Sequence, residues 1–321
     1  MRELLRRLVA LAAAVALVAG LLAVGIFLAR LLDGSVGLRG AVGALVGIAL
    51  VALAARAVPA PSLLGGYSAV VYACLFLPIV IVIVYAFNAG RYVAVWDGFS
   101  LESFSAALRD DSITSSIELS FRIGLVTAIV STVLGTAGGL ALARARTRTR
   151  TPIEVVVLLT VVVPEVVIAI ALLIFFVNMG FALGPTTMLL GHCVFNMSLV
   201  MLIVRARFVA LGDTLEEASR DLGASPLATF RQITLPRIAP AVIAGGLLAF
   251  TFSFDDVVIS NFTAGAGNET WPLHILSALR FGLSPTLNAA ATLMIGVTLV
   301  GLALAALAYR MGTRDERLEQ A

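Results

Sequence analysis

Runs of about twenty apolar residues, such as VVYACLFLPIVIVIVYAF at positions 70–87, dominate this sequence. Of its 321 residues, 60% are hydrophobic and 13% are charged, which leaves too little polar surface to cover a water-soluble globule. In lipid, backbone N–H and C=O groups must form hydrogen bonds within their own segment, and the alternating pattern of a membrane β-barrel is missing. The sequence therefore predicts an all-α protein, a polytopic bundle of transmembrane helices.

The apolar runs predict about eight membrane spans. They lie near residues 8–32, 40–57, 67–88, 117–143, 153–177, 185–204, 238–260 and 288–309. The stretch VPAPSLLGG at 58–66 has the composition of a linker, so we expect an N-terminal extension with two helices (1–60) and a six-helix core (61–315). A cleavable signal peptide is the rival interpretation of residues 1–32, but their long apolar run favours a membrane anchor.

Basic residues indicate the orientation. All 22 are arginines, and most fall on the cytoplasmic side if the N-terminus is cytoplasmic. The acidic segment WDGFSLESFSAALRDDS (96–112) then falls outside. Because cytoplasmic loops carry the excess of basic residues, we predict a multi-pass protein of the cytoplasmic (inner) cell membrane with both termini in the cytoplasm.

The lack of lysine excludes one class of site. A nucleotide-binding P-loop needs Gly-x-x-x-x-Gly-Lys-Ser/Thr, which this chain cannot supply. Cys74 and Cys193 lie in separate apolar runs without redox or zinc spacing. His192 lies in the sixth span and His274 in the last expected outer loop, and neither has a third ligand at metal spacing. We therefore expect no metal and no cofactor on this chain.

A polar insert, DTLEEASRDLGASPLATFRQITLP at 213–236, interrupts the apolar pattern between the sixth and seventh spans. It belongs to a loop, residues 205–240, on the predicted cytoplasmic side. Thr214 followed by Glu217 predicts a capping box at the start of a short helix. Gly223 predicts the left-handed residue that ends this helix.

A second short helix is predicted to begin with Ser225 as N-cap and Pro226 as first helical residue. We expect it to end near Ile233, Leu235 and Pro236 and to lead into the next span. The first helix has one apolar or small face, formed by Leu215, Ala218, Ser219 and Leu222. Such a face is suited to a groove on another protein.

The polar insert has two other interpretations. Capping signals are common wherever helices begin, so an ordinary solvated connecting loop is the simpler alternative. Nucleic-acid binding by two short helices is disfavoured, because the insert carries more acids than arginines and has no basic face for phosphates.

The spacing of residues in the insert, from position 217 to position 236, resembles the signature of the permease subunits of ABC importers. That signature is Glu-Ala-Ala, three residues, Gly, nine residues, Ile-x-Leu-Pro. Ser219 replaces the second alanine. The segments at 164–176, 253–265 and 272–292 further resemble the spermidine/putrescine transport system permease family. The likeness covers about residues 67–311. The matching signature positions are Glu217, Ala218, Gly223, Ile233, Leu235 and Pro236.

The resemblance implies a division of labour between chains. Two permease subunits, usually different, would form the pore, a dimer of ATP-binding subunits would hydrolyse MgATP, and an extracytoplasmic binding protein would deliver the solute. The insert would be the coupling helix seated in the ATPase, so this chain would be no enzyme itself. The implied cargo is a small cation, with spermidine or putrescine as the expected solute. An amino-acid derivative, thiamine or a metal chelate are the alternatives.

Ionisable and amide side chains within the spans are candidates for the translocation pathway, because such groups are costly in lipid. They are Glu165, Asp255, Asp256, His192 and Asn196. We expect Glu165 near the middle of the fifth span, either facing the pore or hydrogen-bonded within the bundle. Asp255 and Asp256 point about 100° apart on a helix, so at most one is expected to face the pore axis. These two acids either attract solute or hold a gate or kink.

Two other classes of membrane protein are alternatives to the importer. An ion-coupled secondary transporter could use Glu165 for proton coupling, but would show internal repeats and would have no use for the polar insert. A membrane-embedded hydrolase or transferase could use Asp255 and Asp256, but would need further converging acids, histidines or a metal.

Overall fold

The structure, a computed structural model, describes residues 60–90, 95–212, 214–281 and 284–300. The chain divides into two compact units, residues 1–85 and 86–321. The two predicted N-terminal spans, 8–32 and 40–57, lie outside the described residues, as does the end of the last span. The predicted division into an extension and a six-helix core therefore stays a prediction.

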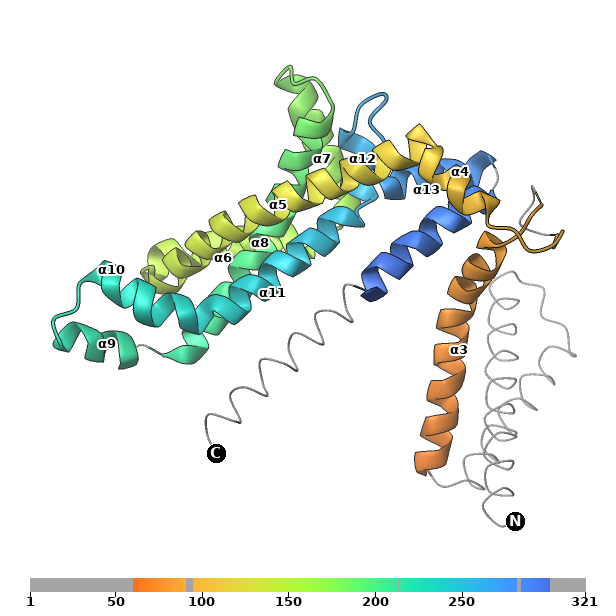
Figure 1. The fold of residues 1–321 in the computed structure, drawn as a ribbon. Coiled ribbons are helices and arrows are strands. Elements are labelled where there is room, and N and C mark those ends of the chain that lie inside the picture. The colour runs from red at the N-terminus through yellow and green to blue at the C-terminus, as the bar shows by residue number, and fades with distance from the viewer. Residues whose placement is uncertain (1–59, 91–94, 213, 282–283, 301–321) are drawn as a thin grey trace, which may run out of the picture. The chain divides into compact units, whose positions relative to one another are not determined.

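Helix α3 (Ala60–Ala86) is the described part of the first unit (Figure 1). Its apolar stretch Gly65–Ala86 is long enough to cross a membrane and agrees with the predicted span 67–88. Large apolar side chains are exposed around it, among them Leu75, Val80 and Val84. A helix that is apolar on all sides is typical of a membrane span.

The regular elements in the described part of the second unit are helices, and an isolated bridge pairs Asn88 with Phe99. This confirms the all-α prediction. Together with α3, the described residues contain four helices long and apolar enough to cross a membrane, or five if the bent pair α6–α7 counts as one span. The elements of this unit are α4 (Glu102–Arg109), α5 (Asp111–Arg144), α6 (Thr147–Val162), α7 (Glu165–Asn178), α8 (Pro185–Leu211), α9 (Thr214–Asp221), α10 (Pro226–Thr229), the π-helix η1 (Phe230–Thr234), α11 (Leu235–Phe254), α12 (Val258–Thr263), α13 (Trp271–Phe281) and an apolar helix, Pro285–Val300.

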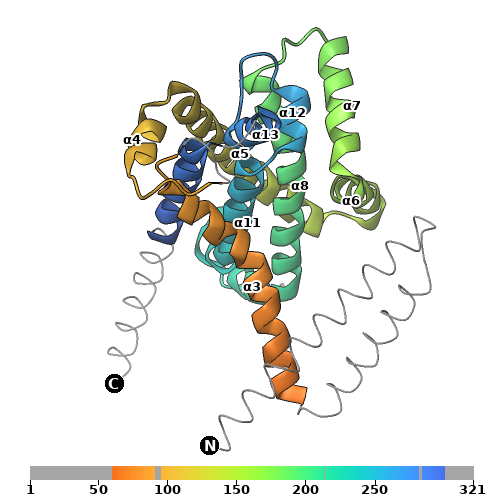
Figure 2. The same ribbon diagram turned by 90° about the vertical axis from the view of Figure 1, so that its right-hand side faces the viewer.

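Helices α5, α8 and α11 pack along one another at the centre of this unit (Figures 1 and 2). Small residues let helix backbones approach closely, which is how helices associate in lipid. A Cβ atom added at Gly139 would lie 2.8 Å from the carbonyl oxygen of Met201 on α8. The small buried residues of α5 are Ser116, Ser120, Gly124, Thr127, Ser131, Gly135 and Gly139.

The prediction of one span over 153–177 is wrong in its shape. The chain instead forms α6 and α7, which meet at an angle of 107° around Val163 and Pro164 (Figure 2). Proline lacks the N–H that would continue the helix, and it disfavours helical dihedral angles in the preceding residue. Val163 accordingly has an extended conformation, with φ −65° and ψ 135°. Glu165 therefore begins α7, directly beside the break.

The seventh predicted span, 238–260, is wrong at both ends. Helices α10, η1 and α11 form one continuous helix from Pro226 to Phe254. The predicted end of the second short helix near Pro236 is therefore wrong as well. A proline in the first turn of α11 has no amide to pair, and the π turn before it carries the chain onward without a break. Residues 255–257 then turn the chain into α12.

The close packing of α5 on α8 makes a prediction at Gly139. Gly139→Ala should lower the stability of the protein by about 1–3 kcal/mol, because the added methyl group meets backbone. Gly296→Ala is the matched control, since a Cβ atom there has nothing within 4 Å. Thermal unfolding in detergent measures both variants. Equal melting temperatures would show that α5 and α8 do not pack at this distance.

Candidate functional site

The turn of the polar insert has the geometry that its sequence predicts. Gly223 has φ +81°, in the left-handed region that favours glycine over residues with bulky side chains. Its N–H donates to the Arg220 carbonyl at 2.8 Å, and the N–H of Ala224 donates to the Ser219 carbonyl at 3.1 Å. This pattern closes the last turn of α9. The predicted end of the first short helix is confirmed.

The second short helix also begins as predicted. The Ser225 hydroxyl accepts a hydrogen bond from the N–H of Ala228 at 3.3 Å, and Pro226 is the first helical residue. At the start of α9, Thr214 is itself the first helical residue, and residue 213 before it lies outside the described residues. The capping box of Thr214 and Glu217 therefore stays a prediction.

Helix α9 has an inward and an outward face. Inward, Ser219 is buried, and its hydroxyl lies 3.0 Å from that of Thr229. The prediction that Ser219 shares the apolar face is therefore wrong. Outward, Leu215 and Ala218 are exposed, and Leu222 is 89% exposed. Leu222 follows the last residue of α9, and its N–H still donates to the Ala218 carbonyl at 3.2 Å, so the three positions keep helical spacing and give one side of this polar segment an exposed apolar surface.

The signature residues lie mainly on the surface of the polar insert. Glu217, Ala218, Gly223, Leu235 and Pro236 are exposed, and Ile233 is half-buried. The preceding acid, Glu216, was not among the predicted site residues. It is buried and bonded to Arg144, Arg220 and Thr234. Its partner Arg144 lies 72 residues away in the sequence, so no local pattern marks Glu216 as a buried residue.

At the far end of α11, a buried polar cluster joins α8, α11 and α12. His192 on α8 is 1% exposed, and its Nδ1 lies 2.6 Å from the Ser253 hydroxyl. Its Nε2 lies 3.0 Å from both Asp256 Oδ2 and the Ser260 hydroxyl. The side chain of Asn196 donates to the His192 carbonyl at 2.9 Å. The structure thus brings three of the predicted pathway residues together.

Asp255 and Asp256 have different surroundings. Asp256 is 8% exposed, and its carboxylate accepts hydrogen bonds from the N–H groups of Ile259 at 3.3 Å and Ser260 at 2.7 Å. It thereby satisfies amides that the start of α12 leaves without helical partners. Asp255 is exposed and lines a cavity of about 590 Å³ together with Phe254 and Thr251. Glu165 is exposed, and its carboxyl group interacts with that of Asp256.

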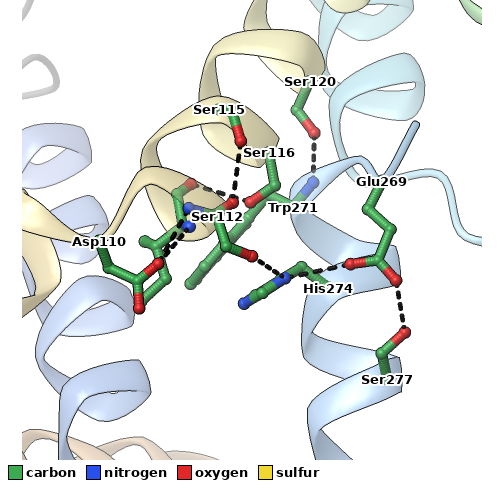
Figure 3. Close-up of polar contacts among 10 residues, drawn as sticks. Asp110, Ser112, Ser115, Ser116, Ser120, Glu269, Trp271, His274 and Ser277 are labelled. Carbon is green, nitrogen blue, oxygen red and sulfur yellow. Dashed lines mark hydrogen bonds and ion pairs between the residues drawn. The ribbon is translucent and has the colours of Figure 1, made fainter. Parts of the chain in front are cut away.

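A second polar cluster joins α13 to the start of α5 (Figure 3). His274, predicted in the last outer loop, lies on the short helix α13 between α11 and the apolar helix Pro285–Val300. Its Nδ1 lies 3.2 Å from Glu269 Oε2 and 3.5 Å from the Ser112 hydroxyl. The N–H of Trp271 donates to the Ser120 hydroxyl at 2.7 Å. Within the described ranges, no group of three His, Cys, Asp or Glu side chains is placed to hold a metal ion.

Comparison with known families identifies the chain. Residues 134–313 match the family described as "Binding-protein-dependent transport system inner membrane component". The chain belongs to this family. It is a membrane permease subunit of an ABC importer, and the matched region contains the polar insert and the His192 cluster.

Individual relatives agree with this assignment. The permease is 35% identical to the spermidine/putrescine transport system permease protein PotC of Escherichia coli K12, over 74% of this chain and 89% of that protein. It is 37% identical to the putrescine transport system permease protein PotI of the same strain, over 71% and 84%. Among solved structures, a chain of a bacterial ABC transporter involved in the import of the acidic polysaccharide alginate matches with a TM-score of 0.56 and 17% identity, over 75% of this chain and 92% of that chain.

The buried surroundings of Asp256 make a prediction about stability. Asp256→Ala should destabilise the permease by about 3–5 kcal/mol, because it removes one partner of a buried pair and the acceptor for two amides. Asp255→Ala is the matched control and should unfold like the wild type, since that side chain is exposed. Thermal unfolding in detergent compares the two. A melting temperature for Asp256→Ala equal to the control would contradict the structural role.

Proposed function

We propose that this permease forms, with a second and different permease subunit, the pore of an ATP-driven importer of polyamines in the cytoplasmic membrane. Its polar insert docks on an ATP-binding subunit, and an extracytoplasmic binding protein delivers the solute. The exposed apolar surface on α9, held beside the Gly223 turn, is the observation that carries the docking role.

The outward leucines support docking into a protein groove. Leu222 is 89% exposed, Leu227 66% and Leu215 49%, although the surrounding segment is polar. An amphipathic helix stabilises a complex by placing such side chains in an apolar groove. The inward hydrogen bond between Ser219 and Thr229 keeps the two short helices together, so the surface is presented as one unit.

The partner also supplies the nucleotide site. This chain contains no lysine, so the P-loop and its MgATP belong to the ATP-binding subunits. Closure of these subunits on ATP would displace α9, and the continuous helix Pro226–Phe254 would carry the displacement into the membrane.

The arginines support the cytoplasmic placement of the insert. Arg144 at the end of α5 bonds to Glu216 of the insert, and the Arg207 side chain donates to the Arg237 carbonyl at 3.4 Å. The basic ends of α5, α8 and α11 therefore lie at the same end of the bundle as the insert. This end is cytoplasmic by the positive-inside rule, which also places both termini in the cytoplasm.

The cationic cargo is supported by the names of the relatives and by the acids at the helix breaks. Spermidine and putrescine carry ammonium groups separated by methylene chains. Asp255 offers an exposed carboxylate at the edge of an apolar cavity, and Glu165 is exposed beside the α6–α7 break. A carboxylate within an apolar wall suits a cation with an apolar body.

Substitution of Gly223 tests the docking role. Gly223→Val should reduce uptake by about tenfold while ATP hydrolysis continues, because a β-branched residue is strained at φ +81° and displaces the surface of α9. Gly223→Asn is the control at the same position, since asparagine tolerates this conformation. Both are measured in proteoliposomes that contain the whole importer. Wild-type uptake by Gly223→Val would refute the role of the turn.

Substitution of Asp255 tests the cationic cargo. Asp255→Asn should lower the rate of putrescine uptake about fivefold, because the dication loses an attractive charge, and the difference should shrink at high salt. Asp255→Glu keeps the charge and should retain uptake. Radiolabelled putrescine in the reconstituted importer measures all three proteins. Unchanged uptake by Asp255→Asn would remove Asp255 from the pathway.

A further inference from the structure

The buried carboxylate of Glu216 on α9 contacts residues of α5 and η1. Its role, as inferred here, rests on the proposed function. Glu216 is 4% exposed. Arg144 Nη2 lies 2.9 Å from Oε1 and 3.1 Å from Oε2. Arg220 Nη2 lies 3.3 Å from Oε2, and the Thr234 hydroxyl donates to Oε1. One side chain of α9 thus binds the last residue of α5 and the last residue of η1.

These bonds make the junction stiff. Hydrogen bonds between a carboxylate and guanidinium groups are the stronger kind in proteins. Separating a buried carboxylate from its partners leaves an unpaired charge, which costs several times more than a surface ion pair is worth. Arg144 is also held over the ring of Phe208 on α8, with its guanidinium carbon 5.0 Å from the ring centre. Helix α9 therefore moves together with the ends of α5 and η1.

The two connected helices run through the bundle. From Arg144, α5 extends back to Asp111, near α13. From Thr234, the chain continues as α11 to Phe254, beside Asp255 and the buried cluster of Asp256. A displacement of α9 thereby reaches both long helices through a single carboxylate.

We propose that Glu216 is the positioning residue that transmits movement of α9 to α5 and α11. In this role Glu216 contacts neither the solute nor the nucleotide. It holds the polar insert against α5 and α11, so that the insert and these helices move together. Removal of its charge loosens this junction while the exposed docking surface of α9 remains. The number of solute molecules imported per ATP then falls.

Glu216→Gln tests the proposal in the complete importer, reconstituted in proteoliposomes with putrescine as solute. Uptake per ATP hydrolysed should fall about tenfold, with ATP hydrolysis maintained. Glu154→Gln is the matched control. Glu154 is also paired with two arginines, Arg205 and Arg150, but it connects α6 to α8 and does not contact the insert. Uptake per ATP hydrolysed by Glu154→Gln should stay within about twofold of wild type. A wild-type ratio for Glu216→Gln would overturn the proposal.

A double-mutant cycle shows whether Glu216 and Arg144 act through their shared contact or whether each substitution impairs the importer separately. Arg144→Gln should resemble Glu216→Gln, and the double variant should be no worse than either, because both remove the same contact. If the two losses multiply in the double variant, the proposal is overturned.

If Glu216→Gln does not assemble, the variant Thr234→Val tests the proposal instead, since it removes one hydroxyl group that bonds to Glu216 and keeps the ion pair with Arg144. Putrescine uptake per ATP hydrolysed should fall about threefold in Thr234→Val, and an unchanged value would equally overturn the proposal.

Failure of the proposed function would look different. In that case the wild-type importer itself would show no uptake that depends on ATP. Wild-type activity together with an unaffected Glu216→Gln variant would refute only the role of Glu216.

Discussion

A helix within hydrocarbon must satisfy its own backbone hydrogen bonds, and this constraint decides where the permease departs from regular helix. Two departures within the described residues lie at a proline or beside polar side chains. Pro164 breaks the chain between α6 and α7, and Asp256 accepts from the first amides of α12 where α11 ends. The irregular places are therefore the places where ionisable groups gather, and they are the candidates for the translocation pathway.

The continuous helix from Pro226 to Phe254 connects the two kinds of site. At one end, the polar insert presents exposed leucines and is joined to the bundle through Glu216. At the other end lie exposed Asp255 and the buried pair of Asp256 with His192. The proposed importer uses this helix as its mechanical link, since a rigid element with partners at both ends transmits a displacement without bending.

The sequence predicted correctly those local features that depend on a few neighbouring residues, such as turns and helix starts. The turn at Gly223 and the start at Ser225 and Pro226 follow from glycine conformation and capping, and both are confirmed. The sequence also predicted apolar spans, but it could not predict the 107° bend at Pro164, since a proline within an apolar run either kinks or ends a helix. The inward position of Glu216 depends on Arg144, which is 72 residues away. Contacts between distant residues leave no local pattern.

The central claim is that force enters this permease from an ATP-hydrolysing partner through the polar insert. The most direct measurement is accumulation of putrescine in proteoliposomes containing the permease pair and binding protein, with and without the ATP-binding subunits. The account predicts accumulation only when these subunits and MgATP are present. Uphill accumulation driven by an ion gradient, with no ATP-binding subunit in the membrane, would contradict it.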